Sequence, residues 1–358
     1  MNPHSALIFI AVLSLASFAI ALSSSPIVEK FLYKYKCWKK QVRTVAPDGS
    51  ATPIFSALHK DRETKIPRMA GIIISGAVAV VTIGGAIIAQ IAPHSLLAQF
   101  NFLNRSQTWI PLFTFVAASL LGLADDILVV SGFGATEKGG GIKFRHRLAV
   151  VFAIGLIGAY WFHFKLGWDM LHIPLYGDLL IGAWYIPLFI FVMVGLFSTS
   201  VVDGLDGLAG GIFAILFATF AAIAFARGQF FLSAFCAVIA GALLAFLWFN
   251  IPPARFYMGE TGILALTTTL GVVAFFTNSV LLLPIAGVLL VVEGGSVALQ
   301  LFSKKFFKRK LFLVAPYHHH LEAKGWPAHQ VTMRFWLVTG VSCMAALVIA
   351  LLDIIFKK

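Results

Sequence analysis

The arrangement of apolar residues limits this chain to one class of fold. Ten long apolar runs follow one another with polar segments between them, and each run is close to the roughly 20 residues that a membrane crossing needs. Of the 358 residues, 59% are hydrophobic and only 12% are charged, too few charges for the surface of a soluble protein. We therefore predict an all-α, polytopic integral membrane protein with one domain over residues 1–358. The predicted spans start near Ala6, Met69, Trp109, Leu148, Trp184, Leu208, Phe230, Gly262, Ser279 and Phe335.

The basic residues predict the orientation of the chain. With the N-terminus outside, nearly all of the 27 Lys and Arg fall in cytoplasmic segments, as the positive-inside rule requires. The exceptions are Arg105, Lys165, Arg227, Lys357 and Lys358. The formal net charge of +12 is spread over short loops, so we expect no nucleic-acid partner. Outside, the stretch from Lys165 to Trp184 is expected to form a small hairpin or an interfacial segment.

Two acidic pairs lie at predicted cytoplasmic ends of spans. Asp125 and Asp126 close the third span, where adjacent carboxylates repel each other and oppose the helix dipole. Asp203 and Asp206 lie three residues apart in VVDGLDGLAGG, a spacing that would make them neighbours on one face of a helix start. Acids at the edge of a membrane are costly and point to function, and hard oxygen ligands suit Mg²⁺. Taken alone, either pair also fits a polar turn or an exposed helix end.

Further polar residues fall on the same face. Glu260 precedes a span and can join the acidic group, or it can simply favour a helix N-terminus. Tyr257 is expected on an exposed loop, where its ring can stack on a base. Within the ninth span, Glu293 and the two glycines after it interrupt the apolar run, which predicts a broken helix there. The surrounding cations are Lys65, Arg68, Lys138, Lys143, Arg145 and Arg147.

A histidine run and a basic run follow the ninth span. In APYHHHLEAKGW the consecutive His318, His319 and His320 cannot all face one way, so one or two are expected to contact a phosphate or orient a carboxylate. The upstream run KKFFKRK suits anionic headgroups. Together, the acids, the cations and the membrane favour a site in which a metal-neutralised pyrophosphate meets a lipid phosphate.

These motifs resemble the polyprenyl-phosphate N-acetylhexosamine-1-phosphate transferases, and the HHHLEAKGW run resembles their muramoyl-pentapeptide branch. The resemblance covers ADD, DGLDGLAGG, YMGETG and nearly the whole chain. It implies transfer of phospho-MurNAc-pentapeptide from its UDP carrier to undecaprenyl phosphate, giving lipid I and UMP in peptidoglycan synthesis. It also implies a Mg²⁺ cofactor, contact with membrane lipids, a homodimer and a cytoplasmic active site at the bacterial inner membrane.

The resemblance assigns roles to individual residues. It implies a catalytic group of Asp125, Asp126, Asp206, His318 and His319. It implies metal ligands at Glu260 and Asp203. It implies substrate contacts from Lys65, Lys143, Arg145, Ser200, Asp203, Gly204, Leu205, Tyr257, Gln300 and His320.

The chain departs from the family pattern at several positions. Asparagines are usual where this sequence has Phe197 and Ser200, aspartate is usual at Glu260, and a lysine is usual near Val129. We expect a divergent but active enzyme. The alternatives are a UDP-GlcNAc-dependent transferase of the same family, a transporter or flippase that uses intramembrane acids, and a catalytically inactive lipid-binding homologue.

Overall fold

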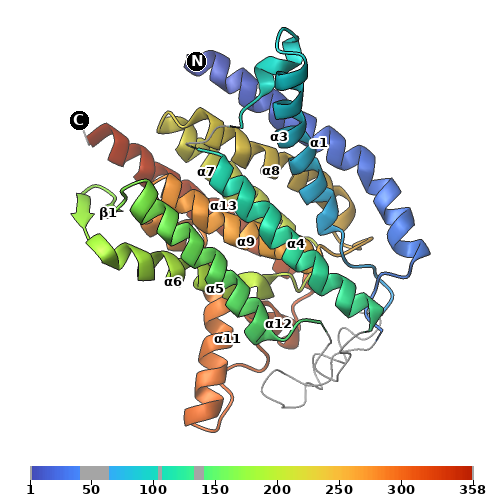
Figure 1. Cartoon of the computed structure of the whole chain (residues 1–358). Helices are drawn as coiled ribbons and strands as arrows, with labels where there is room; N and C mark the ends of the chain where they lie inside the picture. The colour runs from blue at the N-terminus through green and yellow to red at the C-terminus, as the bar shows by residue number, and fades with distance from the viewer. Residues whose placement is uncertain (1, 41–63, 104–106, 133–140, 357–358) are drawn as a thin grey trace.

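The computed structural model describes residues 2–40, 64–103, 107–132 and 141–356, and within these ranges the chain is almost entirely helical (Figure 1). The long helices are α1 (Pro3–Lys34), α3 (Gly71–Ile91), α4 (Trp109–Ser131), α5 (Phe144–Tyr160), α6 (Tyr185–Ser198), α7 (Leu208–Ala226), α8 (Phe230–Asn250), α9 (Gly259–Phe276), α11 (Val288–Phe306) and α13 (Ala328–Phe356). The short helical elements are η1 (Leu96–Phe100), the π-helix η2 (Trp161–Lys165), η3 (Gly182–Trp184), η4 (Thr199–Val202), η5 (Val280–Leu282), α10 (Leu283–Ala286) and α12 (Tyr317–Ala323).

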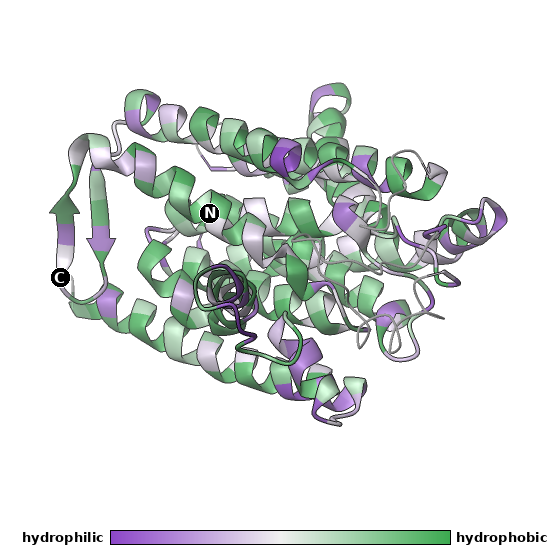
Figure 2. Cartoon of the chain, turned by 90° about the horizontal axis from the view of Figure 1, so that it is seen from below, coloured by the Kyte–Doolittle hydropathy of each residue, from purple (hydrophilic) through white to green (hydrophobic). Residues whose placement is uncertain are grey.

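The helices account for every predicted membrane span. Nine helices in the described part of the chain are long and apolar enough to cross a membrane, and the bent segment of η5, α10 and α11 makes a tenth if it is counted as one span. In Figure 2 the helices carry the hydrophobic colour along most of their length. The prediction of an all-α, polytopic membrane protein is confirmed.

The centre of the bundle is formed by α7, α8 and α9. Buried residues make up 94% of the most apolar stretch of α9 but only 28% of that of α13, so α9 is a core helix and α13 lies at the periphery. Small residues let neighbouring helices approach α9 closely, as is usual in membranes. A Cβ at Gly122 of α4 would overlap the carbonyl of Glu260, and one at Gly71 of α3 would overlap the backbone of Gly262. This close packing brings α4 against the first turn of α9.

The ninth span is broken at a different place from the one predicted. The chain turns by 82° between the η5–α10 segment and α11, at Gly287, whereas α11 runs without interruption through Glu293. Gly287 has backbone angles outside the helical range, with φ −95° and ψ 33°. The later glycines serve packing instead, because a Cβ at Gly294 would lie only 3.3 Å from Thr199 Cγ2. As a result α11 leaves the bundle and projects across the direction of the other helices (Figure 1).

The stretch between Lys165 and Trp184 forms the small hairpin that was one of its two predicted forms. Its strands, β1 (Met170–Ile173) and β2 (Gly177–Leu180), pair in antiparallel register. His172 Nε2 lies 2.7 Å from Asp353 Oδ2, and Arg227 Nη2 donates to the same oxygen at 3.1 Å. These contacts tie the hairpin to α13 at one end of the bundle, and the acidic motifs lie at the other end.

Candidate functional site

The first turn of α9 is the point on which the acidic motifs converge. Asp126, in the last two turns of α4, is fully buried, and its two oxygens accept hydrogen bonds from Glu260 N–H at 3.1 Å, from Thr261 N–H at 2.9 Å and from the Thr261 hydroxyl at 2.7 Å. Arg68 Nε lies 3.9 Å from Asp126 Oδ1. The first N–H groups of a helix have no partner within it, so a carboxylate at this place stabilises the helix start.

Arg147 joins Asp125 to Glu260. Its Nη1 lies 2.5 Å from Glu260 Oε1 and 3.4 Å from Asp125 Oδ2, and Asp125 Oδ1 also accepts the N–H of Ile142 at 2.5 Å. Two arginines, Arg68 and Arg147, therefore supply positive charge beside the acidic pair. Glu260 Oε2 is buried and has no hydrogen-bond partner in the described residues. We call Asp125, Asp126, Asp203 and Glu260 the carboxylate cluster.

Asp203 and Asp206 do not share a helix face, and that prediction was wrong. Gly207 takes a left-handed conformation with φ 75°, so α7 begins only at Leu208 and both acids lie in the preceding turn. Asp203 accepts the N–H of Gly259, whereas Asp206 Oδ2 accepts the N–H of Ala254 at 3.1 Å. Asp203 therefore holds the first residue of α9, and Asp206 holds the segment that joins α8 to α9.

The Asp203 carboxyl interacts electrostatically with the other members of the carboxylate cluster. Burial raises its pKa to about 6; Arg68 and the Gly259 N–H oppose the shift, and the nearby carboxylates of Glu260 and Asp126 add to it. A cation bound beside this buried carboxyl and its acidic neighbours would favour its ionised form.

Residues from α8 and α13 hold the acidic turn in place. Asn250 accepts the N–H of Gly207 through Oδ1 at 3.1 Å and donates through Nδ2 to the carbonyl of Phe256 at 2.8 Å. The Thr332 hydroxyl donates to the carbonyl of Asp206 at 3.1 Å, and Trp336 Nε1 donates to that of Gly207 at 3.1 Å. The turn is thus built into the core rather than left as a free loop.

The three histidines face three different ways, as expected. His318 Nδ1 lies 2.7 Å from Glu293 Oε2, and both side chains are fully buried. His319 Nδ1 lies 2.6 Å from Glu322 Oε2, and His320 Nδ1 accepts the N–H of Leu313 at 3.2 Å. His318 Nε2 is buried and has no hydrogen-bond partner in the described residues.

Gly204 connects the histidines to the carboxylate cluster. A Cβ at this position would overlap His318 Nε2, so the histidine lies directly against the turn that carries Asp203. In the same turn Leu205 is buried, and Ser200 just before it is partly buried and accepts the Asp203 N–H through its carbonyl at 3.3 Å. The structure therefore brings DGLDG, YMGETG, ADD and the histidine motif together.

Other residues assigned by the resemblance lie farther out or have other partners. Tyr257 is partly buried rather than exposed. Its backbone pairs with the segment before α3, because its N–H donates to the carbonyl of Pro67 and its carbonyl accepts the N–H of Ala70. The side chains of Lys65, Lys143 and Arg145 are exposed.

Gln300 holds a loop of its own chain. Its Oε1 accepts the N–H groups of Leu311 and Phe312, and its Nε2 donates to the carbonyl of Phe312 at 3.0 Å. Lys138 lies outside the described residues.

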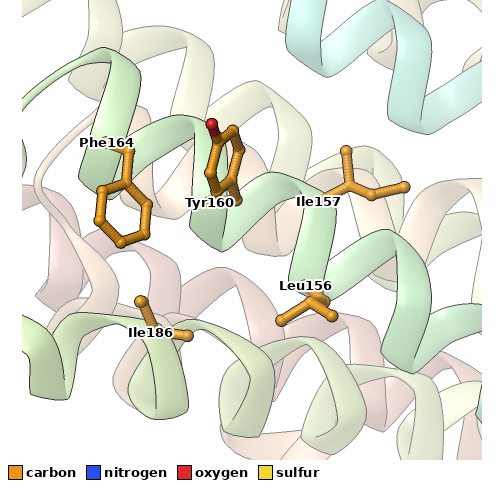
Figure 3. Close-up of a pocket in the computed structure, with 5 residues that line it drawn as sticks. All are labelled: Leu156, Ile157, Tyr160, Phe164 and Ile186. Atoms are coloured by element: carbon orange, nitrogen blue, oxygen red, sulfur yellow. The ribbon is translucent and has the colours of Figure 1, made fainter.

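A hollow of about 390 Å³ between α5 and α6 is separate from this site (Figure 3). It is lined by Leu156, Ile157, Tyr160, Phe164 and Ile186. On α5, Tyr160 lies about 20 Å along the helix from Arg147. The lining is almost wholly apolar, with the Tyr160 hydroxyl as its one polar side-chain group, so the hollow has no charged side chain to bind a phosphate.

Comparison with known proteins places the chain among transferases. Residues 108–278 match glycosyl transferase family 4. A phospho-N-acetylmuramoyl-pentapeptide-transferase of Chloroflexus aurantiacus is 31% identical over 354 residues, covering 95% of this chain and 89% of that protein. The chain belongs to this family. The corresponding protein of Caldanaerobacter subterraneus is 32% identical, with 92% and 95% covered, and that of Granulibacter bethesdensis is 38% identical, with 74% and 78% covered.

In this member of the phospho-N-acetylmuramoyl-pentapeptide-transferase family, Thr261 is a site residue to which the sequence assigned no role, although it lies in the YMGETG motif. Its role depends on the packing of α4 against α9, which brings Asp126 to its N–H and hydroxyl. Arg68 and Arg147 were recognised as cations, but their pairing with Asp126 and with Asp125 and Glu260 joins segments far apart in sequence. No spacing rule predicts such pairs.

Proposed function

We propose that this chain transfers phospho-N-acetylmuramoyl-pentapeptide from its UDP carrier to undecaprenyl phosphate, giving lipid I and UMP for peptidoglycan synthesis. The observation that carries the proposal is the convergence of the acidic motifs, two arginines and His318 at one end of a membrane bundle in a chain of this family. The distribution of Lys and Arg supports placing that end on the cytoplasmic face of the bacterial inner membrane.

The reaction exchanges one P–O bond for another. An oxygen of the lipid phosphate attacks the sugar-bound phosphorus of the donor, the bond from that phosphorus to the oxygen it shares with UMP breaks, and UMP leaves. A phosphate monoester with a second pKa near 6 is largely dianionic at neutral pH, so the attacking oxygen needs no base. The task of the protein is therefore to position two anions and to neutralise their charge.

The buried polar atoms of the site are suited to this task. Asp125 and Glu260 hold the guanidinium of Arg147, and its buried Nε has no hydrogen-bond partner in the described residues. His318 Nδ1 faces Glu293, which leaves Nε2 for a phosphate oxygen beside Gly204. We propose that Arg147 Nε and His318 Nε2 both bind the diphosphate of the donor.

The residues present also fit a Mg²⁺ ion bound together with substrate. Mg²⁺ usually needs only one or two carboxylates and completes its shell with water and phosphate oxygens. In the described residues no three acidic, histidine or cysteine side chains gather closely enough to hold an ion alone. However, Glu260 Oε2 is a buried acceptor with no hydrogen-bond partner in these residues, and the pKa of the nearby Asp203 carboxyl is raised by burial and by the carboxylates of Glu260 and Asp126. We propose that Asp203 and Glu260 hold the ion, which would neutralise part of the negative charge of the donor's diphosphate.

The test is release of UMP by the detergent-purified protein. The protein is supplied with UDP-MurNAc-pentapeptide, undecaprenyl phosphate and Mg²⁺. In separate reactions, EDTA takes the place of Mg²⁺, or UDP-GlcNAc takes the place of the muramoyl donor. Glu260→Gln removes a proposed metal ligand, and Asp169→Asn, at the opposite end of the bundle, is the matched control. We expect release that needs the metal and the muramoyl donor, is lost in Glu260→Gln and is kept in Asp169→Asn.

Other results would assign the chain differently. Release from UDP-GlcNAc instead would make it a transferase of the sister branch. Absence of release from either donor, in a sample that unfolds cooperatively on heating, would favour an inactive lipid-binding homologue. Full release in the presence of EDTA would reject the proposed metal ion.

A further inference from the structure

The helix α11 has its polar side turned inward. Its buried residues include the polar stripe Glu293, Ser296, Gln300 and Ser303. Its exposed large apolar residues are Val291, Leu299, Leu301, Phe302 and Phe306. A helix on the surface of a soluble protein shows the reverse pattern, so the outer side of α11 is suited to lipid.

Beyond this apolar side, the end of α11 is basic and aromatic. We call residues 302–310 the α11 tip. The Phe302 ring packs on Phe306 and Phe307, with centroids 4.5 and 6.0 Å apart, and Lys305 Nζ lies 5.5 Å from the centroid of Phe306. Four exposed cations of the tip are Lys305, Lys308, Arg309 and Lys310. In Figure 2 this end of α11 points toward the viewer and is coloured hydrophilic.

The α11 tip is held in a defined shape by buried polar side chains. Gln300 forms hydrogen bonds with the backbone of Leu311 and Phe312, in the segment that follows the tip. The Ser303 hydroxyl donates to the carbonyl of Arg309 at 2.9 Å. Both Gln300 and Ser303 are buried. Because these bonds fix the turn, the cations are displayed together beside exposed phenylalanine rings.

We propose that the α11 tip binds the headgroups of anionic phospholipids in the leaflet on the side of the site. The three phenylalanines insert beneath the headgroups, and the four cations lie at the level of the phosphates. Clusters of four or more Lys and Arg at the end of an amphipathic helix suit anionic lipid, and rings interleaved with them add apolar contact. The charge of the tip therefore selects an anionic over a zwitterionic lipid surface.

The α11 tip is also in contact with the site. The returning segment packs Phe312 on His320, with ring centroids 5.5 Å apart, and Leu313 donates to His320 Nδ1. His320 is two residues from His318, so an anchored tip restrains the segment that carries the histidines.

The experiment measures which lipids the intact protein retains. Protein purified in mild detergent is incubated with equal amounts of phosphatidylglycerol and phosphatidylcholine, and bound lipids are counted by native mass spectrometry. The tip variant combines Lys305→Gln, Lys308→Gln, Arg309→Gln and Lys310→Gln. The matched control combines Lys30→Gln, Lys34→Gln, Lys36→Gln and Lys40→Gln, exposed cations at and just beyond the end of α1, and so removes the same charge.

We expect wild type and control to prefer phosphatidylglycerol and the tip variant to lose this preference by about tenfold or more, since one cation near an anionic surface is worth about a fivefold change. A milder variant, Lys308→Gln with Lys310→Gln, lies beyond the end of the helix and should lose part of the preference without a change in melting temperature. An equal loss of the preference for phosphatidylglycerol in the tip variant and the control, or no loss in either, would overturn the proposal. So would a tip that retains added undecaprenyl phosphate but not phosphatidylglycerol, because it would then be a substrate site.

Discussion

Asp126 Oδ2 accepts two hydrogen bonds from Thr261, one from its backbone N–H at 2.9 Å and one from its hydroxyl at 2.7 Å. Its other oxygen accepts the N–H of Glu260, so the first turn of α9 uses both oxygens of this carboxylate. The neighbouring Asp125 faces Arg147 and Ile142 instead. Adjacent acids in one motif therefore have different surroundings, and we expect Asp126 to position Glu260 rather than to contact substrate.

Asp126→Asn tests this positioning role. An amide accepts hydrogen bonds only through its single oxygen, so at least one of the three donors loses its partner. We expect the free energy of unfolding to fall by about 1–3 kcal/mol, measured as a lower melting temperature in detergent. Thr261→Ser keeps both donors and should change the melting temperature much less. An unchanged melting temperature in Asp126→Asn would contradict the role.

Arg147→Met tests the link between Asp125 and Glu260. Removal of the guanidinium leaves two carboxylates without their shared cation, and breaking a buried pair from one side costs about 3–5 kcal/mol. Because Arg147 is partly exposed, we expect the lower part of that range, together with loss of transferase activity. In a double-mutant cycle, Glu260→Gln should be less destabilising in the Arg147→Met background than in wild type. Strictly additive effects would mean that the two side chains do not interact.

The sequence predicts the spans because most of the apolar runs are continuous over the length of a membrane crossing and are separated by polar segments. It does not predict the course of α11, since Glu293 was taken as an interruption whereas the actual turn is at Gly287. An acid that pairs with a buried histidine does not disturb a helix. The partner of Glu293 is 25 residues away, in α12.

At the site, the acidic residues could be found from the sequence, but their geometry could not. The spacing of Asp203 and Asp206 suggests one helix face, yet the left-handed Gly207 delays the helix and sends the two carboxylates to different partners. Pairing within the cluster depends on how closely α4 approaches α9, which the glycine at position 122 permits. Such tertiary contacts leave no periodic pattern in the sequence.

Gly204→Ala tests the contact between the acidic turn and the histidine. A Cβ at position 204 would overlap His318 Nε2, so the turn or the histidine must move. We expect UMP release to fall by at least about tenfold, because a small misplacement of catalytic groups has a large effect on rate. Gly295→Ala is the matched control, since its Cβ would meet nothing within 4 Å and alanine favours a helix. Equal activity in the two variants would show that this close approach is not needed.

His320→Gln tests the pH dependence of the segment behind the site. Burial lowers the pKa of His320 and Lys324 adds to the shift, and the Leu313 N–H occupies Nδ1, so the folded protein favours the neutral ring. A folded-state pKa below the unfolded value of about 6.5 means that this stabilisation is present above that pH and is lost as the pH falls through the folded-state pKa. We therefore expect the melting temperature of wild type to drop more steeply on acidification below about pH 6.5 than that of His320→Gln. The exposed His329→Gln should follow wild type, and parallel curves for all three proteins would contradict the assignment.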